Sequence, residues 1–61
     1  MQSNHIEIYF EIIGETEKAV RVSDGINRDW LPKSQITINR IKDDDAEITL
    51  PEWLAKKKSF I

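Results

Sequence analysis

Residues 5–13 alternate between apolar and polar side chains with a period of two, and this pattern constrains the fold more than any other. The apolar positions are Ile6, Ile8, Phe10 and Ile12, and the polar positions between them are His5, Glu7, Tyr9 and Glu11. Such alternation is typical of a β-strand that is buried on one face only. We therefore expect a sheet with one face on a core and the other in solvent.

Turn signals divide the next residues into further strands. Residues 14–16 are expected to form a turn, and residues 17–23 the hairpin partner of the first strand. In that strand, the side chains of Val20 and Val22 are expected to face inward, and those of Ala19 and Arg21 outward. Asp24-Gly25 is the strongest turn signal, because glycine tolerates the positive φ of a tight hairpin. Residues 26–28 are expected to extend that loop.

A proline interrupts the third expected strand, which begins at Asp29. Pro32 cannot donate a backbone hydrogen bond, so the strand must be interrupted, bent or at a sheet edge there. Residues 32–34 are expected to form a short turn or a single helical turn. Strand pairing is expected to resume at Ile36. Ile36 and Ile38 are expected to face inward, and Thr37 and Asn39 outward.

A loop, a last strand and a short helix are expected near the C-terminus. The loop covers residues 42–45, and the strand that follows points Ala46, Ile48 and Leu50 inward. Thr49 followed three residues later by Glu52 matches a capping box, and Pro51 suits a first helical turn. The helix is expected to end in lysines 56–58, which suit its dipole.

Apolar residues flank this expected helix and suggest how it docks. Trp53 and Leu54 are expected to anchor it on the sheet, so loss of the Trp53 side chain would cost roughly 3 to 5 kcal/mol. Phe60 and Ile61 are expected to pack back on the core. The chain is thus expected to be a single mainly β domain over residues 1–61. We expect a four- to five-stranded bent sheet or partly open barrel, of the Src-homology-3-like pattern, with a short C-terminal helix.

Size and composition limit the classes of function. With 61 residues the chain is near the lower limit for folding alone, so a homodimer is one expectation. Without cysteine, disulfides and thiolate sites are excluded. No signal peptide or membrane-length apolar run is present, so we expect a cytoplasmic protein, and Met1 suggests a complete reading frame.

Residues that could carry catalysis or bind a metal are sparse. His5 is the only histidine, and we interpret it as a solvated surface residue. Asp43–Asp45 lack the spacing of a calcium loop, and we interpret them as an acidic turn. The two glycines are too far apart for a phosphate-binding loop. We expect no enzyme activity, no cofactor and no metal.

Charged residues come in blocks despite a net charge of only −2. Residues 1–17 and 43–52 are acidic, whereas residues 18–42 and 53–61 are basic. The blocks could pair across strands, or they could form one basic and one acidic face. Trp30 and Leu31 should point to opposite faces of their strand, so one of these two residues cannot be in the core. Which one is exposed stays open, and so does the alternative that Trp30 and Trp53 are both core residues.

Two classes of partner remain. A protein partner is favoured because Trp, Tyr and Arg dominate interface hot spots. The alternative is single-stranded nucleic acid, which aromatic platforms flanked by Lys and Arg can hold, although the acidic first strand would repel phosphate. The candidate partner-binding residues are Trp30, Lys33, Arg21, Arg28, Tyr9 and Arg40. No membrane partner is expected.

Three sequence blocks resemble a group of very short proteins from phages and other mobile elements. They are residues 15–20 (Glu-Thr-Glu-Lys-Ala-Val), residues 30–36 (Trp-Leu-Pro-Lys-Ser-Gln-Ile) and residues 50–55 (Leu-Pro-Glu-Trp-Leu-Ala). The chain departs from the pattern at Asp43–Asp45 and at its lysine-rich end. The resemblance implies a small β-barrel and an accessory protein in a bacterial host. In that context we expect it to bind or inhibit a host macromolecule, such as a defence or transcription component.

Overall fold

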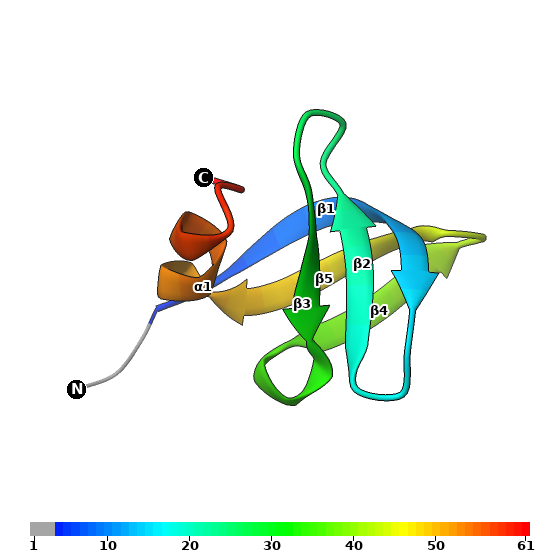
Figure 1. Cartoon of the computed structure of the whole chain (residues 1–61), viewed down its shortest axis with the longest axis horizontal. Helices are drawn as coiled ribbons and strands as arrows, with labels where there is room; N and C mark the ends of the chain where they lie inside the picture. Colours follow the sequence, from blue (N-terminus) through cyan, green and yellow to red (C-terminus); the bar gives the residue numbers. More distant parts are fainter. Residues whose placement is uncertain (1–3) are drawn as a thin grey trace.

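Five antiparallel strands form one open sheet, and a short helix follows them (Figure 1). The computed structural model describes residues 4–61. Residues 1–3 lie outside the described part, and the expectation that the N-terminus is not a signal peptide partly concerns them. The elements in chain order are β1 (His5–Glu15), β2 (Ala19–Ser23), β3 (Arg28–Pro32), the 3₁₀ helix η1 (Lys33–Gln35), β4 (Thr37–Lys42), β5 (Asp45–Pro51) and α1 (Glu52–Lys57). The mainly β fold with a C-terminal helix is therefore confirmed.

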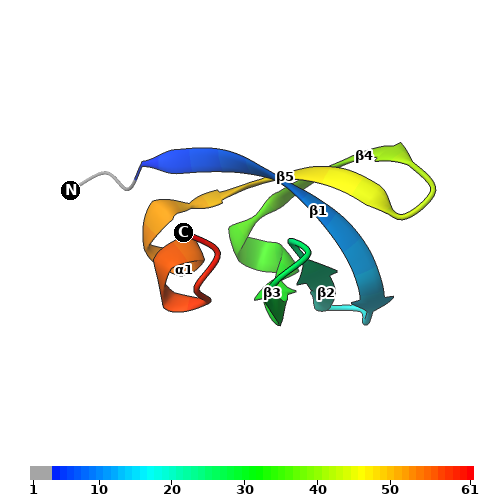
Figure 2. The same ribbon diagram turned by 90° about the horizontal axis from the view of Figure 1, so that it is seen from above.

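The strand order across the sheet is β3-β2-β1-β5-β4. The two edge strands, β3 and β4, are thus consecutive in the chain, and η1 connects them. Figure 2 shows that β1 curves from a layer with β5 and β4 into a layer with β2 and β3. The expected helical turn after Pro32 is confirmed as η1, and β3 is an edge strand, as the proline allows.

The core lies between these two layers. The residues expected to face inward from β1, β2 and β5 are buried or half-buried, and fully buried side chains include Phe10, Val20, Val22, Ile48 and Leu50. Ile36 and Ile38 are partly buried against this core, as expected. The period-two alternation therefore assigned the faces of the strands correctly.

A β-bulge near the end of β1 changes the expected first turn. The register between β1 and β2 shifts between Ile12 and Gly14, so Ile13 is an extra residue in the strand. Gly14 and Glu15 consequently remain in β1, and the turn covers residues 16–18 instead of 14–16. An isolated glycine within a strand often marks such a bulge.

The hairpin turns are tighter than expected. Arg28 already belongs to β3, where it pairs with Ser23. Lys42 pairs with Asp45, which shortens the expected acidic loop to Asp43 and Asp44. The positive φ predicted for Gly25 is confirmed at 97°.

The expected capping box is wrong. Pairing of β5 with β1 continues to the pair Pro51–His5, so Thr49 is a strand residue and is not available to cap a helix. Helix α1 begins at Glu52, and Pro51 precedes it without any side-chain cap. Within the described residues 4–61, no helix has the length and hydropathy required to cross a membrane.

Helix α1 docks through residues other than the expected tryptophan. Leu54 and Ala55 are buried, whereas Trp53 is 48% exposed, so Trp53 is not a core residue. Beyond the helix, Ser59 has a positive φ of 65°, which reverses the chain and returns Phe60 to the core. The expectation for the tail holds for Phe60 and is wrong for Ile61, which is exposed.

Candidate functional site

The outer face of β1, β2 and β3 carries a row of three paired residues. Gly14 of β1 pairs with Arg21 of β2, and Arg21 pairs with Trp30 of β3. Leu31, next in the chain, is completely buried, so Trp30 points away from the core. Trp30 is 41% exposed. The prediction that Trp30 and Leu31 face opposite sides of the strand is confirmed, and the exposed residue is Trp30.

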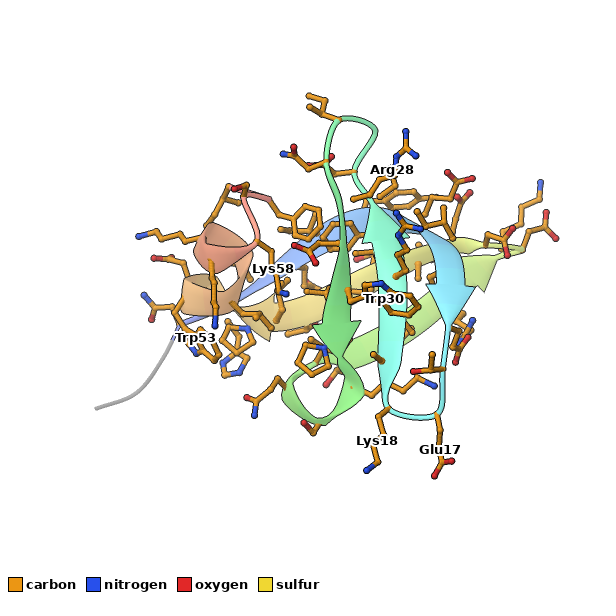
Figure 3. All side chains as sticks on the ribbon, in the orientation of Figure 1. Glu17, Lys18, Arg28, Trp30, Trp53 and Lys58 are labelled. Carbon is orange, nitrogen blue, oxygen red and sulfur yellow. The ribbon has the colours of Figure 1, made fainter. Side chains whose placement is uncertain are left out.

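The indole of Trp30 reaches across β2 to Gly14. A β-carbon built on Gly14 would lie 3.5 Å from Cη2 of Trp30 and 3.3 Å from Cβ of Arg21. Figure 3 shows the Trp30 side chain lying across β2 on the outside of the sheet. The indole therefore lies over Gly14, with room for a methyl group at that position but not for a larger side chain. Trp30 is thus partly covered, and the exposed 41% of it remains accessible.

A second row lies beside the first, toward the tip of the β2–β3 hairpin. Glu11 pairs with Ser23, and Ser23 pairs with Arg28. A shallow depression lies over the second row and reaches the first row at Arg21, and its lining residues are Glu11, Ile13, Arg21, Ser23, Gly25 and Arg28. We call the surface formed by Gly14, Arg21, Arg28, Trp30 and Ile13 the outer-face site.

Two arginines at this site have no internal partner. Within residues 4–61, neither Arg21 nor Arg28 takes part in an ion pair. Four other cations are bound by carboxylates of the chain, for example Lys56 by Glu52 and Lys58 by Asp29. Lys18, Lys42 and Lys57 also have no ion pair within these residues, but they lie on other elements. The outer-face site therefore combines an exposed indole with two available guanidinium groups.

Lys33 and Arg40 belong to a different cluster. Lys33 Nζ lies 2.7 Å from Oε2 of Glu15, and Nη2 of Arg40 lies 2.8 Å from Oε1 of the same carboxylate. Hydrogen bonds from Lys33 and then Arg40 lower the pKa of Glu15. Because Glu15 pairs with buried Val20, this cluster lies on the side of the sheet opposite to Trp30. The structure thus separates these two candidates from the outer-face site.

Tyr9 is also separate from the outer-face site. It is exposed and pairs with Glu47 of β5, which in turn pairs with Asn39 of β4. Along β1, Tyr9 lies about 16 Å from Gly14 at roughly 3.3 Å per residue. Partial desolvation and the nearby Asp45 raise the pKa of Tyr9. Tyr9 therefore belongs to an acidic part of the outer surface.

Both interpretations of the charge blocks hold in part. Glu15 draws together cations from η1 and β4, which is pairing between blocks. On the outer face, the arginines lie on β2 and β3 and the acids on β1 and β5, and the two groups meet where Glu11 shares a depression with Arg21 and Arg28. Those acids are Glu7, Glu11, Asp45 and Glu47.

Ile13 and Ile26 are exposed apolar residues that were not among the candidate partner-binding residues. Ile13 is the bulge residue beside the outer-face site, and Ile26 stands at the tip of the β2–β3 hairpin with 88% exposure. The signal for Ile13 was the Ile12-Ile13-Gly14 run, in which two adjacent isoleucines break the alternation directly before a glycine. Such a break followed by glycine is typical of a bulge.

Within the part of the chain that the structure describes, no group of three or more potential ligands is placed to hold a metal ion. His5 is exposed at the start of β1, and Asp43 and Asp44 form a surface turn. Comparison with protein families, with curated proteins and with solved structures found no match to this chain. The resemblance to mobile-element proteins therefore stays a prediction.

Proposed function

We propose that this protein is a small binding module that recognises another protein through the outer-face site. The observation that carries the proposal is the exposed indole of Trp30, which lies over Gly14 on the same face as two unpaired arginines. Tryptophan and arginine are the residue types that most often dominate protein interfaces. A domain of this size has little apolar surface to leave exposed without a use.

Exposed apolar residues on this side of the sheet favour a protein partner over a nucleic acid. Ile13 beside the site and Ile26 at the hairpin tip are accessible hydrophobic side chains that offer no ring for base stacking. Glu11 lines the same depression and would repel phosphate. A protein surface can satisfy all of these groups at once, because interfaces combine an apolar centre with a polar rim.

The biological setting rests on the resemblance to phage and mobile-element proteins. On that basis we propose an accessory protein that acts in the cytoplasm of a bacterial host and inhibits a host protein by covering part of its surface. A Src-homology-3-like relationship is proposed on the same basis, supported by the meander of β1, β2 and β3 and by η1 before β4. No catalytic role is proposed.

Both sheet edges carry features that oppose a homodimer formed by strand pairing. At the β3 edge, Asp29 Oδ1 accepts the backbone N–H of Trp30 at 2.7 Å, and Pro32 has no N–H. The β4 edge carries a register shift between Arg40 and Lys42. Bulges, prolines and charged side chains are features that oppose pairing of edge strands.

Capture of a partner from bacterial lysate tests the proposal. The wild type and Trp30→Ala are compared with Trp53→Ala, which removes a similarly exposed tryptophan from a different element. We expect a specific band with the wild type and with Trp53→Ala, and its loss with Trp30→Ala. Equal capture by folded Trp30→Ala, with folding checked by circular dichroism, would remove the outer-face site from the function.

The second candidate is binding of single-stranded nucleic acid, which the juxtaposition of Trp30 with Arg21 favours. Its test is a titration of a fluorescent oligonucleotide at low salt, followed by anisotropy. Nucleic-acid binding predicts saturation and a steep loss of affinity with added salt. Absence of binding at micromolar protein would exclude this candidate.

A further inference from the structure

We infer that the outer-face site takes an extended, acidic protein segment in which acidic and apolar side chains alternate along the face that meets the site, two residues apart in its sequence. This inference rests on the proposed function, and it specifies the chemistry of the partner. The apolar side chain would lie on the indole of Trp30. The acidic side chains would pair with the guanidinium groups of Arg28 and Arg21.

Charge complementarity is the first argument. Arg21 and Arg28 have no ion-pair partner within residues 4–61, and both lie on the outer face that also carries Trp30. The other unpaired cations, Lys18, Lys42 and Lys57, lie on other elements. An arginine presents a planar fork of donors that matches a carboxylate, so two such groups beside one ring favour an acidic ligand.

Spacing is the second argument. Arg28 and Trp30 are alternate residues of β3 on the same outer face, which separates their backbone positions by about 6.6 Å. Alternate side chains of an extended peptide have the same repeat. A segment laid along β3 can therefore place a carboxylate at Arg28 and an apolar side chain at Trp30, two residues further on.

Glu11 provides a control, because its substitution should change the affinity in the direction opposite to substitution of the arginines. It lines the same depression and lies in one row with Ser23 and Arg28. A carboxylate here repels an acidic segment, and its removal should strengthen binding. A cationic ligand would show the reverse dependence on Glu11.

The test follows the two indole Nε1–H signals of the ¹⁵N-labelled protein during titration with a synthetic peptide. The probe is a twelve-residue peptide in which pairs of glutamates alternate with pairs of tyrosines, so that each face of the extended peptide carries glutamate and tyrosine in turn. Its control has glutamine in place of glutamate. We expect the glutamate peptide to shift the Trp30 signal saturably while the Trp53 signal stays in place. The glutamine peptide should bind at least about fivefold more weakly.

Charge variants locate the binding. Arg28→Gln and Arg21→Gln should each weaken binding of the glutamate peptide about fivefold, and Glu11→Gln should strengthen it. Lys57→Gln is the matched control, because it removes one positive charge from exposed α1 and should change the affinity little. No saturable shift of the Trp30 signal, or equal losses in Arg28→Gln and Lys57→Gln, would overturn the inference.

The same measurements separate this inference from the proposed function. If Arg28→Gln captures the lysate partner as well as the wild type does while Trp30→Ala loses it, the acidic partner is wrong and protein binding stands. If Trp30→Ala captures the partner equally well, both are wrong. A twelve-nucleotide oligothymidine that shifts the Trp30 signal at lower concentration than the glutamate peptide would assign the site to nucleic acid instead.

Discussion

At the scale of single residues, the position of Gly14 explains how a tryptophan can lie flat on the outside of a sheet. The bulge at Ile13 turns Gly14 toward solvent, in line with Arg21 and Trp30. A β-carbon at position 14 would lie 3.3 Å from Cβ of Arg21, which is a tight contact, and 3.5 Å from Cη2 of Trp30, which is an ordinary van der Waals contact. A larger side chain would therefore collide with both. Gly14 is therefore a determinant of the site through space and not through its backbone conformation.

Replacement of Gly14 tests this role. Gly14→Val should displace the indole of Trp30 and cost about 1–3 kcal/mol of unfolding free energy, because the added methyl groups overpack the contact. Urea unfolding and the Trp30 Nε1–H chemical shift measure the two effects. An unchanged Trp30 signal in a folded Gly14→Val protein would show that the indole does not depend on position 14.

Because Trp53 is exposed, truncation of its side chain should destabilise the fold less than the sequence alone suggests. With about half of the side chain in solvent, Trp53→Ala should cost about 1–2 kcal/mol instead of the roughly 3 to 5 kcal/mol of a buried tryptophan. Urea unfolding of Trp53→Ala beside Leu54→Ala checks this. Leu54 is buried, so its loss should be the more severe.

At the scale of elements, α1 is too short to be stable by itself, and its tail holds it in place. The ring of Phe60 meets Phe10 edge to face, with centroids 4.7 Å apart. Asn27 Nδ2 donates to the carbonyl of Ser59 at 2.7 Å, and Lys58 Nζ lies 3.4 Å from Asp29 Oδ1. The tail thereby links the helix to the β2–β3 hairpin and closes one end of the space between the two layers.

Truncation of Phe60 and of Ile61 shows which tail side chain stabilises the fold. Phe60→Ala should cost about 3–5 kcal/mol, since Phe60 is only 8% exposed and fills the core beside Phe10. Ile61→Ala should change stability by less than about 0.5 kcal/mol, because Ile61 is a surface residue. Thermal unfolding followed by circular dichroism compares the two, and similar losses would contradict the role given to Phe60.

At the scale of the whole molecule, Glu15 connects the ends of an open sheet. Its carboxylate binds Lys33, which follows edge strand β3, and Arg40 of edge strand β4. The two edges are not hydrogen-bonded to each other. Glu15 and the C-terminal tail are therefore two separate connections across the opening.

Acid should weaken the fold through Glu15 and Asp24. Lys33 and Arg40 lower the pKa of Glu15, and the backbone N–H groups of Asn27 and Ile26 lower the pKa of Asp24. Each folded-state pKa lies below its unfolded value, so the unfolded chain binds more protons as the pH falls. The stabilisation is complete above the ordinary carboxyl range and should be lost progressively as the pH falls below about 4.5.

Urea unfolding at pH 7 and at pH 3 measures this loss. Glu15→Gln should be less stable than the wild type at pH 7, and the difference should shrink at pH 3. Glu17→Gln is the control, because Glu17 lies in the exposed β1–β2 turn and has no ion pair within residues 4–61. A constant difference between Glu15→Gln and the wild type at both pH values would contradict the role of these pairs.

Local patterns determined most of the secondary structure and one feature of the site. Alternation in β1, β2 and β5 identified the strands and their buried faces, because a period of two follows from strand geometry alone. The opposite directions of Trp30 and Leu31 follow from the same rule. Pro32 and Gly25 marked η1 and the β2–β3 turn through their own backbone restrictions.

Only the tertiary structure decided which of these residues meet. The crossing from β3 to β4 at the opposite sheet edge brought Lys33 and Arg40 to Glu15, and so removed two candidates from the site. The bulge at Ile13 placed Gly14 beneath Trp30, and burial of Leu54 and Phe60 left Trp53 exposed. Such pairings depend on residues far apart in the chain, whereas alternation and turn signals carry information only about near neighbours.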